Sequence, residues 1–188
     1  NTPYEFGYYF FNIVMPKDYP FSPPKVTYCT QNGKTRFNPN LYVNGKVCLS
    51  IINTWSGPRW TSCNTISSVL LSIQALVFIE NPLHNEPGYE KEKGIRNDNY
   101  NHLVLYANFK TAIYQMILSP PPTFEDFNSI TIKNFKDNYE NIIKKIEKNM
   151  KYDKKSYNLQ FYNMNETINY TDLKNSIEDL YKNILNQN

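Results

Sequence analysis

Apolar and polar residues follow two different periods along this chain, and the change of period separates a strand-forming part from a helical part. Residues 8–15 (YYFFNIVM) are mostly aromatic or β-branched and end at Pro16, which predicts a strand. Residues 25–30 and 46–51 have a similar character, so two more strands are expected there. The connections have the length of hairpins, and the predicted sheet is therefore antiparallel.

The helical period begins near residue 65. Apolar residues recur every three or four positions over residues 65–80, with Asn64 as the expected N-cap, and Asn81-Pro82 ends this helix. A second helix is expected from about residue 98 to residue 118, before a run of three prolines that begins at Pro120. A short sheet followed by helices is typical of the α+β class.

The C-terminal part repeats the helical period twice. Residues 139–150 and 173–185 each carry an apolar stripe, whereas the polar, Tyr- and Asn-rich residues 151–170 are expected to form a long loop. Such stripes should be buried, so we expect the helices to pack near Tyr106 and Ile113; a groove for a partner is the alternative. The sequence thus predicts a core over residues 1–123 and a packed helical extension over residues 124–188.

Composition limits the partners and the compartment. The formal charge is only +3 over 188 residues and forms no basic stripe, so a nucleic-acid partner is not expected. No stretch approaches the ~20 apolar residues that cross a bilayer, and neither a signal peptide nor a membrane contact is expected. The three cysteines form no paired framework, which favours a reducing compartment, the cytoplasm or the nucleus.

The candidate chemistry lies between residues 36 and 60. This stretch contains an Asn-Pro-Asn turn, the turn signal Asn44-Gly45 and then Cys48 in an apolar run. An ordinary cysteine thiol is ionised enough near neutral pH to exchange with an activated ester, so Cys48 is the candidate nucleophile. The alternative is a buried structural cysteine. Asn40, eight residues before Cys48, could donate a hydrogen bond to an oxyanion or could simply form the turn.

The other cysteines and the two histidines offer weaker chemistry. Cys29 has the setting of a buried structural cysteine, and Cys63 lies in a polar loop without an evident partner. A cysteine hydrolase would need a histidine near Cys48; His84 lies in a loop and could approach it, whereas His102 lies on a predicted helix. No short paired spacing of Cys and His indicates a metal site, and neither a metal nor a cofactor is expected.

Several motifs occur together in an order and spacing that resemble the ubiquitin-conjugating enzymes: DYPFSPPKV, FNPNLY, GKVCLSI, Trp60 and TISSVLLSIQALV. The resemblance is continuous from residue 2 to about residue 82 and looser to residue 118. LSIINTWSGPRW and ENPLHNEPGYE look like segments of the family's large-loop subgroup, and residues 124–188 would correspond to a C-terminal helical extension. The resemblance implies a UBC-type α+β fold.

The resemblance also implies roles for particular residues. Cys48 would receive ubiquitin or a ubiquitin-like modifier as a thioester from an activating enzyme and pass it to a substrate lysine or a ubiquitin ligase. Asn40 would stabilise the oxyanion or organise the loop. The acidic residue that many members place near the cysteine has no clean counterpart, and the candidates are His84, Asn85 and Glu86. Surfaces that meet ligases and the activating enzyme would include Phe21, Pro58, Trp60 and Ser62.

The chain departs from the family pattern in three places. Asn38 stands where most members have histidine, which we interpret as structural, and Ser62 stands where many have proline, which leaves the set of ligases open. The sequence starts at the family's second strand, so an upstream helix and strand that cover residues 8–15 are expected. The rival interpretation is a non-catalytic module that only binds ubiquitin or a partner, although such variants lack the cysteine. A hydrolase that pairs Cys48 with His84 is the third.

Overall fold

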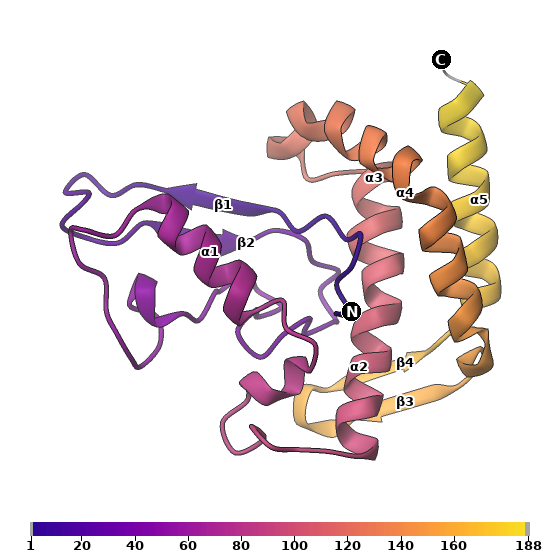
Figure 1. Ribbon diagram of the computed structural model, residues 1–188, viewed down its shortest axis with the longest axis horizontal. Helices are drawn as coiled ribbons and strands as arrows, with labels where there is room; N and C mark the ends of the chain where they lie inside the picture. Colours follow the sequence, from indigo (N-terminus) through magenta and orange to yellow (C-terminus); the bar gives the residue numbers. More distant parts are fainter. Residues whose placement is uncertain (1, 187–188) are drawn as a thin grey trace.

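The computed structural model describes residues 2–186, and its helices and strands form the expected α+β fold (Figure 1). Residue 1, and residues 187 and 188 of the predicted extension, lie outside the described part. The elements in chain order are β1 (Phe11–Val14), β2 (Lys25–Tyr28), η1 (Ser50–Ile52), α1 (Ile66–Leu76), η2 (Pro82–Asn85), α2 (Ile95–Ala107), η3 (Asn108–Gln115), α3 (Met116–Leu118), η4 (Pro122–Phe127), α4 (Asn128–Asn149), η5 (Met150–Tyr152), β3 (Ser156–Leu159), η6 (Gln160–Tyr162), β4 (Met164–Thr167) and α5 (Tyr170–Asn186).

The first sheet consists of two strands. β1 and β2 pair antiparallel, with Phe11 opposite Tyr28 and Val14 opposite Lys25, which confirms the predicted hairpin in a shorter form. The third predicted strand, over residues 46–51, is wrong. Only isolated bridges at Lys46 and Val47 join this segment to its neighbours, because its next backbone N–H groups donate within the Cys48 loop instead.

The N-cap of helix α1 lies one residue later than predicted. Thr65 is the N-cap, and its hydroxyl accepts a 3.2 Å hydrogen bond from the backbone N–H of Ser68. The Ser68 hydroxyl accepts a bond from the Thr65 N–H in return, which completes a capping box. Asn64 was the expected cap, but its side-chain oxygen accepts from the N–H of Thr61 and so closes the turn before the helix.

The second predicted helix is present, but its middle is a π-helix. α2, η3 and α3 follow one another without a break, and η3 has the wider π-helical turn. The buried side chain of Asn108 in η3 accepts a hydrogen bond from the Tyr9 hydroxyl and donates to the Glu5 carbonyl. Polar contacts with the N-terminal segment therefore accompany the change of pitch, which an apolar pattern alone does not reveal.

The C-terminal segment contains two helices and a hairpin. α4 and α5 contact each other, and most of the two predicted apolar stripes is buried, although Leu185 is exposed. The long loop predicted over residues 151–170 is wrong, because β3 and β4 pair antiparallel there, with Ser156 opposite Thr167. Along β3 the exposed Ser156 and Asn158 alternate with the buried Tyr157 and Leu159, a strand period that the polar composition concealed.

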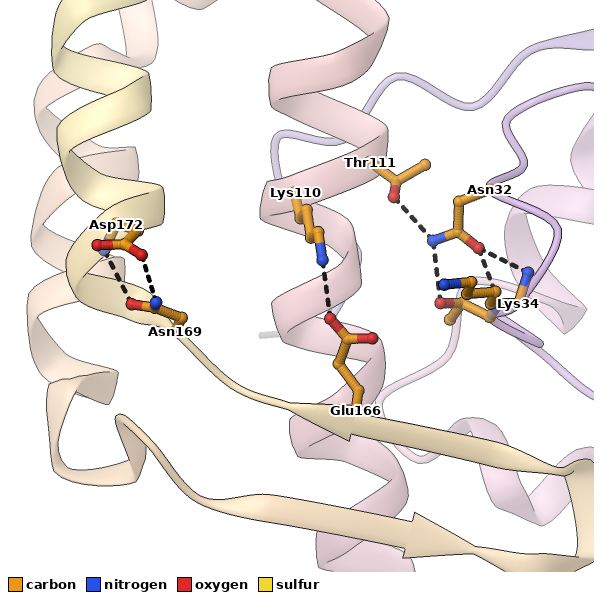
Figure 2. Close-up of polar contacts among 8 residues, drawn as sticks. Asn32, Lys34, Lys110, Thr111, Glu166, Asn169 and Asp172 are labelled. Carbon is orange, nitrogen blue, oxygen red and sulfur yellow. Dashed lines mark hydrogen bonds and ion pairs between the residues drawn. The ribbon is translucent and has the colours of Figure 1, made fainter.

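α5 and the later part of α4 lie along the opposite side of the long central helix from β1, β2 and α1, whereas α4 begins over the end of that helix (Figure 1). The β3–β4 hairpin crosses near the beginning of α2. The ring of Tyr170 in α5 meets that of Tyr106 in α2, with centroids 5.4 Å apart. Figure 2 shows Lys110 of η3 pointing toward Glu166 of β4, with Nζ and Oε1 2.7 Å apart. Residues 124–186 are thus packed on the helix near Tyr106, whereas the domain boundary at residue 124 stays a prediction.

Candidate functional site

Two turns bring Asn40 and Cys48 together. The first follows Asn38, whose carbonyl accepts a 2.9 Å hydrogen bond from the Leu41 N–H, and Gly45 closes the second with a positive φ of 89°. The Cys48 N–H then donates to the Asn40 carbonyl at 2.9 Å, and the Asn40 side-chain Nδ2 donates to the Cys48 carbonyl at 2.6 Å. Backbone and side chain of Asn40 therefore both hold the peptide of the candidate nucleophile.

Asn38 is the buried centre of this loop. Its Nδ2 donates to the Val77 carbonyl at 2.8 Å and to the Tyr4 hydroxyl at 3.2 Å. Its Oδ1 accepts from the Asn40 N–H at 2.8 Å and from the Asn85 side chain at 3.2 Å. One fully buried amide thus joins the N-terminal segment, the end of α1 and the Cys48 loop, which accords with the structural role expected for Asn38.

Cys48 is 3% exposed as a residue and lines a pocket of about 300 Å³. This low exposure agrees with either interpretation of Cys48, but a purely structural cysteine has no need to border a pocket. The side chains around the pocket differ in chemistry and come from segments that are far apart in the sequence: Arg36, Pro39, Asn40, Tyr42, Trp55, Asn85, Glu86, Pro87, Phe161 and Tyr162.

The Asn40 amide retains hydrogen-bonding capacity in this pocket. A side-chain amide has two N–H donors, and one of those on Asn40 is used by the Cys48 carbonyl. The Asn40 Oδ1 is buried and has no hydrogen-bond partner among residues 2–186. The observed bond is that of a loop organiser, and the second N–H remains able to serve an oxyanion, so both expected roles are compatible with this geometry.

The three candidates for an acidic or polar residue near the cysteine, His84, Asn85 and Glu86, lie in different positions relative to the Cys48 pocket. The His84 ring lies 2.9 Å from the Glu92 carbonyl through Nε2 and does not border the Cys48 pocket. Asn85 borders the pocket, but its side chain donates to the Leu76 carbonyl at 2.7 Å as well as to Asn38. Glu86 is the only carboxylate among the described residues that line the pocket.

The four expected partner-binding residues divide into exposed and buried positions. Phe21 is 80% exposed, and Pro58 and Ser62 also lie at the surface. Trp60 is buried, and its contact with a partner stays a prediction. Its indole N–H donates to the Pro20 carbonyl at 2.7 Å, which fixes the loop that presents Phe21.

The remaining cysteines and the second histidine lie outside this pocket. Cys29 is half-buried rather than buried, and burial raises the pKa of its thiol, whereas Cys63 is exposed as expected. His102 packs against the Tyr152 ring, with centroids 3.9 Å apart, and burial lowers its pKa. Within residues 2–186, no group of three or more His, Cys, Asp or Glu side chains could hold a metal ion.

Sequence reasoning assigned no role to several residues of the pocket, among them Arg36, Phe161 and Tyr162. Arg36 places its guanidinium carbon 3.5 Å from the centre of the Tyr42 ring, a cation–π contact that no local pattern indicates. Phe161 and Tyr162 lie in the segment predicted as a loop. Without the β3–β4 pairing, nothing in the sequence places them near Cys48.

An α+β core with a pocketed cysteine held by an asparagine eight residues earlier is the arrangement expected of ubiquitin-conjugating enzymes. The family model described as "Ubiquitin-conjugating enzyme" matches residues 1–106, and the chain belongs to this family. It is similar to ubiquitin-conjugating enzyme E2 Z of Homo sapiens, with 44% identity over 142 residues, or 74% of this chain and 40% of the human protein.

Another curated relative agrees with this assignment. Probable ubiquitin-conjugating enzyme protein 17 of Caenorhabditis elegans is 42% identical over 135 residues, which cover 67% of this chain and 18% of that protein. A solved structure of a Toxoplasma gondii ubiquitin conjugating enzyme E2 domain shares 26% identity, with a TM-score of 0.46, over 60% of this chain and 73% of that chain. The chain spans about two fifths of the length of the E2 Z proteins it matches.

Proposed function

We propose that this chain carries ubiquitin or a ubiquitin-like modifier as a thioester on Cys48 and passes it to a substrate lysine or a ubiquitin ligase. The observation that carries the proposal is the pocket shared by Cys48, Asn40 and Glu86, in which the Asn40 amide lies 2.6 Å from the Cys48 carbonyl. A nucleophile, an amide donor and a carboxylate are the groups that acyl transfer uses.

Loading of Cys48 is a transthiolation. The Cys48 sulfur attacks the carbonyl carbon of the thioester on the activating enzyme, and a new C–S bond replaces the old one. The leaving thiolate stays with the activating enzyme, and the proton of the Cys48 thiol passes to solvent. Because one thioester replaces another, the exchange is near balance and this chain's residues need neither metal nor cofactor for it.

Discharge to lysine is an aminolysis that makes a greater demand on the pocket. The lysine nitrogen attacks the thioester carbonyl, and negative charge develops on the carbonyl oxygen. The second N–H of the Asn40 amide can donate to that oxygen, and one such donor contributes about 3 kcal/mol. The Glu86 carboxylate accepts the proton that the amine releases. The lysine side chain must be slim enough to enter the pocket of about 300 Å³.

Partners follow from the same proposal. The exposed Phe21, Pro58 and Ser62 offer a surface for a ligase and for the activating enzyme, while Trp60 supports it from below. We place the activity in the cytoplasm or nucleus, where thiols stay reduced. No helix within residues 2–186 combines the length and apolar character that a membrane crossing needs.

Two other functions are less well supported. A non-catalytic ubiquitin-binding variant of the fold has no use for a cysteine, yet Cys48 is present and borders a pocket. A hydrolase would need a histidine at Cys48. His84 is instead directed to the Glu92 carbonyl, and neither histidine is among the residues that line the pocket.

The test is to incubate the protein with an activating enzyme, ATP and ubiquitin, and to look for an adduct on a non-reducing gel. We expect a thioester that a reductant cleaves, and a reductant-resistant oxyester when Cys48→Ser replaces the sulfur by oxygen. Cys29→Ser and Cys63→Ser are the matched controls and should still form the thioester. A reductant-sensitive adduct that survives Cys48→Ser contradicts the assignment, as does the absence of any adduct with ubiquitin and ubiquitin-like modifiers.

A further inference from the structure

The turn of the β3–β4 hairpin reaches the Cys48 pocket from the C-terminal segment. This turn, η6, contributes Phe161 and Tyr162 to the pocket lining. Phe161 stacks on the Tyr89 ring with centroids 5.9 Å apart, and the Tyr162 ring lies 5.6 Å from that of Tyr100. Aromatic contacts with the core therefore fix the turn at the pocket.

Tyr162 also binds the pocket's carboxylate. Its hydroxyl donates a hydrogen bond to Oε2 of Glu86, which lies 76 positions earlier in the chain. The Arg36 guanidinium carbon lies 4.9 Å from the centre of the Tyr162 ring. Burial, and then the bond to Glu86, raise the pKa of Tyr162 well above its usual value. The phenol therefore stays protonated near neutral pH and acts as the donor in this bond.

We propose that the β3–β4 turn is part of the active site: Phe161 forms a wall of the Cys48 pocket, and Tyr162 is a positioning residue that holds the Glu86 carboxylate toward the incoming lysine. This inference rests on the function proposed above. It assigns to the C-terminal segment a part in the chemistry of discharge, in addition to its packing on the core.

The positioning role of Tyr162 affects the transfer of one proton, from the attacking lysine amine to Glu86. When the lysine nitrogen attacks the thioester, a C–N bond forms, the C–S bond breaks, and its electron pair returns to the Cys48 sulfur as a thiolate. The amine's proton passes to Glu86 and then to solvent, which also reprotonates the thiolate. A Glu86 side chain released by Tyr162 can rotate away from the pocket, so fewer attacks find an acceptor in place. Loading of Cys48 releases no amine proton and does not need this acceptor.

The first experiment compares Tyr162→Phe with Tyr157→Phe. Both substitutions remove one hydroxyl from the same hairpin, but the Tyr157 hydroxyl lies 3.3 Å from His102 Nδ1, outside the pocket. In single-turnover assays, we expect Tyr162→Phe to slow discharge to free lysine about tenfold, as for loss of a hydrogen bond to a charged group. Loading of Cys48 should change less than about twofold, and Tyr157→Phe should leave both steps within that range.

A double-mutant cycle separates positioning from general damage. In a Glu86→Gln background, Tyr162→Phe should slow discharge by no more than about twofold, because the group on which it acts is already gone. Independent, multiplicative effects of the two substitutions overturn the positioning role. So does a Tyr162→Phe variant that slows loading and discharge equally, or one that slows neither.

The role of Phe161 as a wall of the pocket is tested without any modifier, so its test is independent of the proposed function. The free protein is alkylated with iodoacetamide, and the rate at Cys48 is divided by that at the exposed Cys63 in the same sample, by peptide mapping. Phe161→Ala should raise this ratio severalfold because it opens the pocket. Phe127→Ala, which removes an exposed ring elsewhere in the C-terminal segment, should leave the ratio unchanged. An unchanged ratio in Phe161→Ala overturns the wall.

Discussion

The Cys48 loop and the C-terminal segment both bury apolar side chains, but their backbones are held in different ways. Residues 36–60 contain one short regular element, η1, and are held by side-chain hydrogen bonds such as those of Asn38 and Asn40. Residues 124–186 are nearly all in regular elements, and their stability comes from burial. Their buried side chains are almost all apolar or aromatic: Phe124, Phe135, Ile142, Ile143, Ile146, Tyr157, Leu159, Met164, Ile168, Tyr170, Leu173, Ile177, Leu180 and Ile184.

This difference determines what each region can tolerate. An apolar interface accepts many side chains of similar volume, because burial depends on area and packing rather than on one donor. A buried amide network fails when one donor or acceptor is lost, since its partner is then left unpaired in an apolar surrounding. We therefore expect substitutions at the buried apolar positions of the C-terminal segment to act on stability, and the loss of the Asn40 amide in the Cys48 loop to disturb the site and so the rates.

The largest effect should follow from a cavity in the C-terminal segment. Ile146 of α4 is fully buried, and Ile146→Ala should lower the free energy of unfolding by about 2–5 kcal/mol, measured by urea denaturation. Ile130→Ala in the same helix is the control, because Ile130 is 57% exposed and should cost less than about 0.5 kcal/mol. If the segment is one cooperative unit with the core, a single transition shifts as a whole. If Ile146→Ala instead shifts a separate unfolding transition at lower urea concentration, the C-terminal segment unfolds independently of the core, and this prediction is wrong.

The same difference explains how much of the fold could be predicted. The period of apolar residues predicts α1, the long central helix, α4 and α5, because these elements bury one face. It does not predict the π-helical turn of η3, where the polar side chain of Asn108 makes contacts with residues far away in the chain. It also misses the β3–β4 hairpin, where four-residue strands are too short for their alternation to stand out from a polar background.

The candidate site was predictable only where its residues are close in sequence. Asn40 and Cys48 were identified because two turns and a recurring motif connect them, and the pocket contains both. The sequence offered three neighbouring candidates for the acidic residue, His84, Asn85 and Glu86, and could not select Glu86 among them. The Glu86 carboxylate is bound by the hydroxyl of Tyr162, which is distant in the sequence. Trp60 was expected at the surface. It is buried, and its indole N–H donates to the Pro20 carbonyl, 40 positions earlier in the chain.

The second largest effect is expected in the Cys48 loop, at Asn40. Asn40→Ala removes the donor to the Cys48 carbonyl and the donor available to an oxyanion, and should slow discharge to lysine about 10²-fold while loading continues. Single-turnover rates of both steps are measured beside the melting temperature. Asn44→Ala, at an exposed turn in the same loop, is the control and should change neither rate. An equal loss in loading and discharge, or a large fall in melting temperature, favours a role only in the turn.

The smallest effect tests whether a polar contact matters in the apolar region. Asp153 accepts hydrogen bonds from the N–H of Tyr170 at 2.6 Å and from the Thr171 hydroxyl at 2.7 Å, and so caps the beginning of α5. Asp153→Ala should cost about 1 kcal/mol at pH 7. The Thr171 hydroxyl bond is the main cause that holds the pKa of Asp153 below its usual value. This contribution is therefore complete above the unfolded pKa of about 4 and is lost as the pH falls through the lower folded value.

Urea denaturation of the wild type and the Asp153→Ala variant at pH 7 and at successively lower pH measures this contribution, and the difference between the two proteins should shrink toward the acid end. The control is Asp179→Ala, which removes a surface carboxylate of α5 that pairs with Lys182 at 3.4 Å and should cost less than about 0.5 kcal/mol. A difference between wild type and Asp153→Ala that is independent of pH means that the carboxylate's charge is not what the cap uses. A difference near zero at pH 7 means that apolar burial alone holds α5 in place, and the contrast with the Cys48 loop is then sharper than the hydrogen bonds suggest.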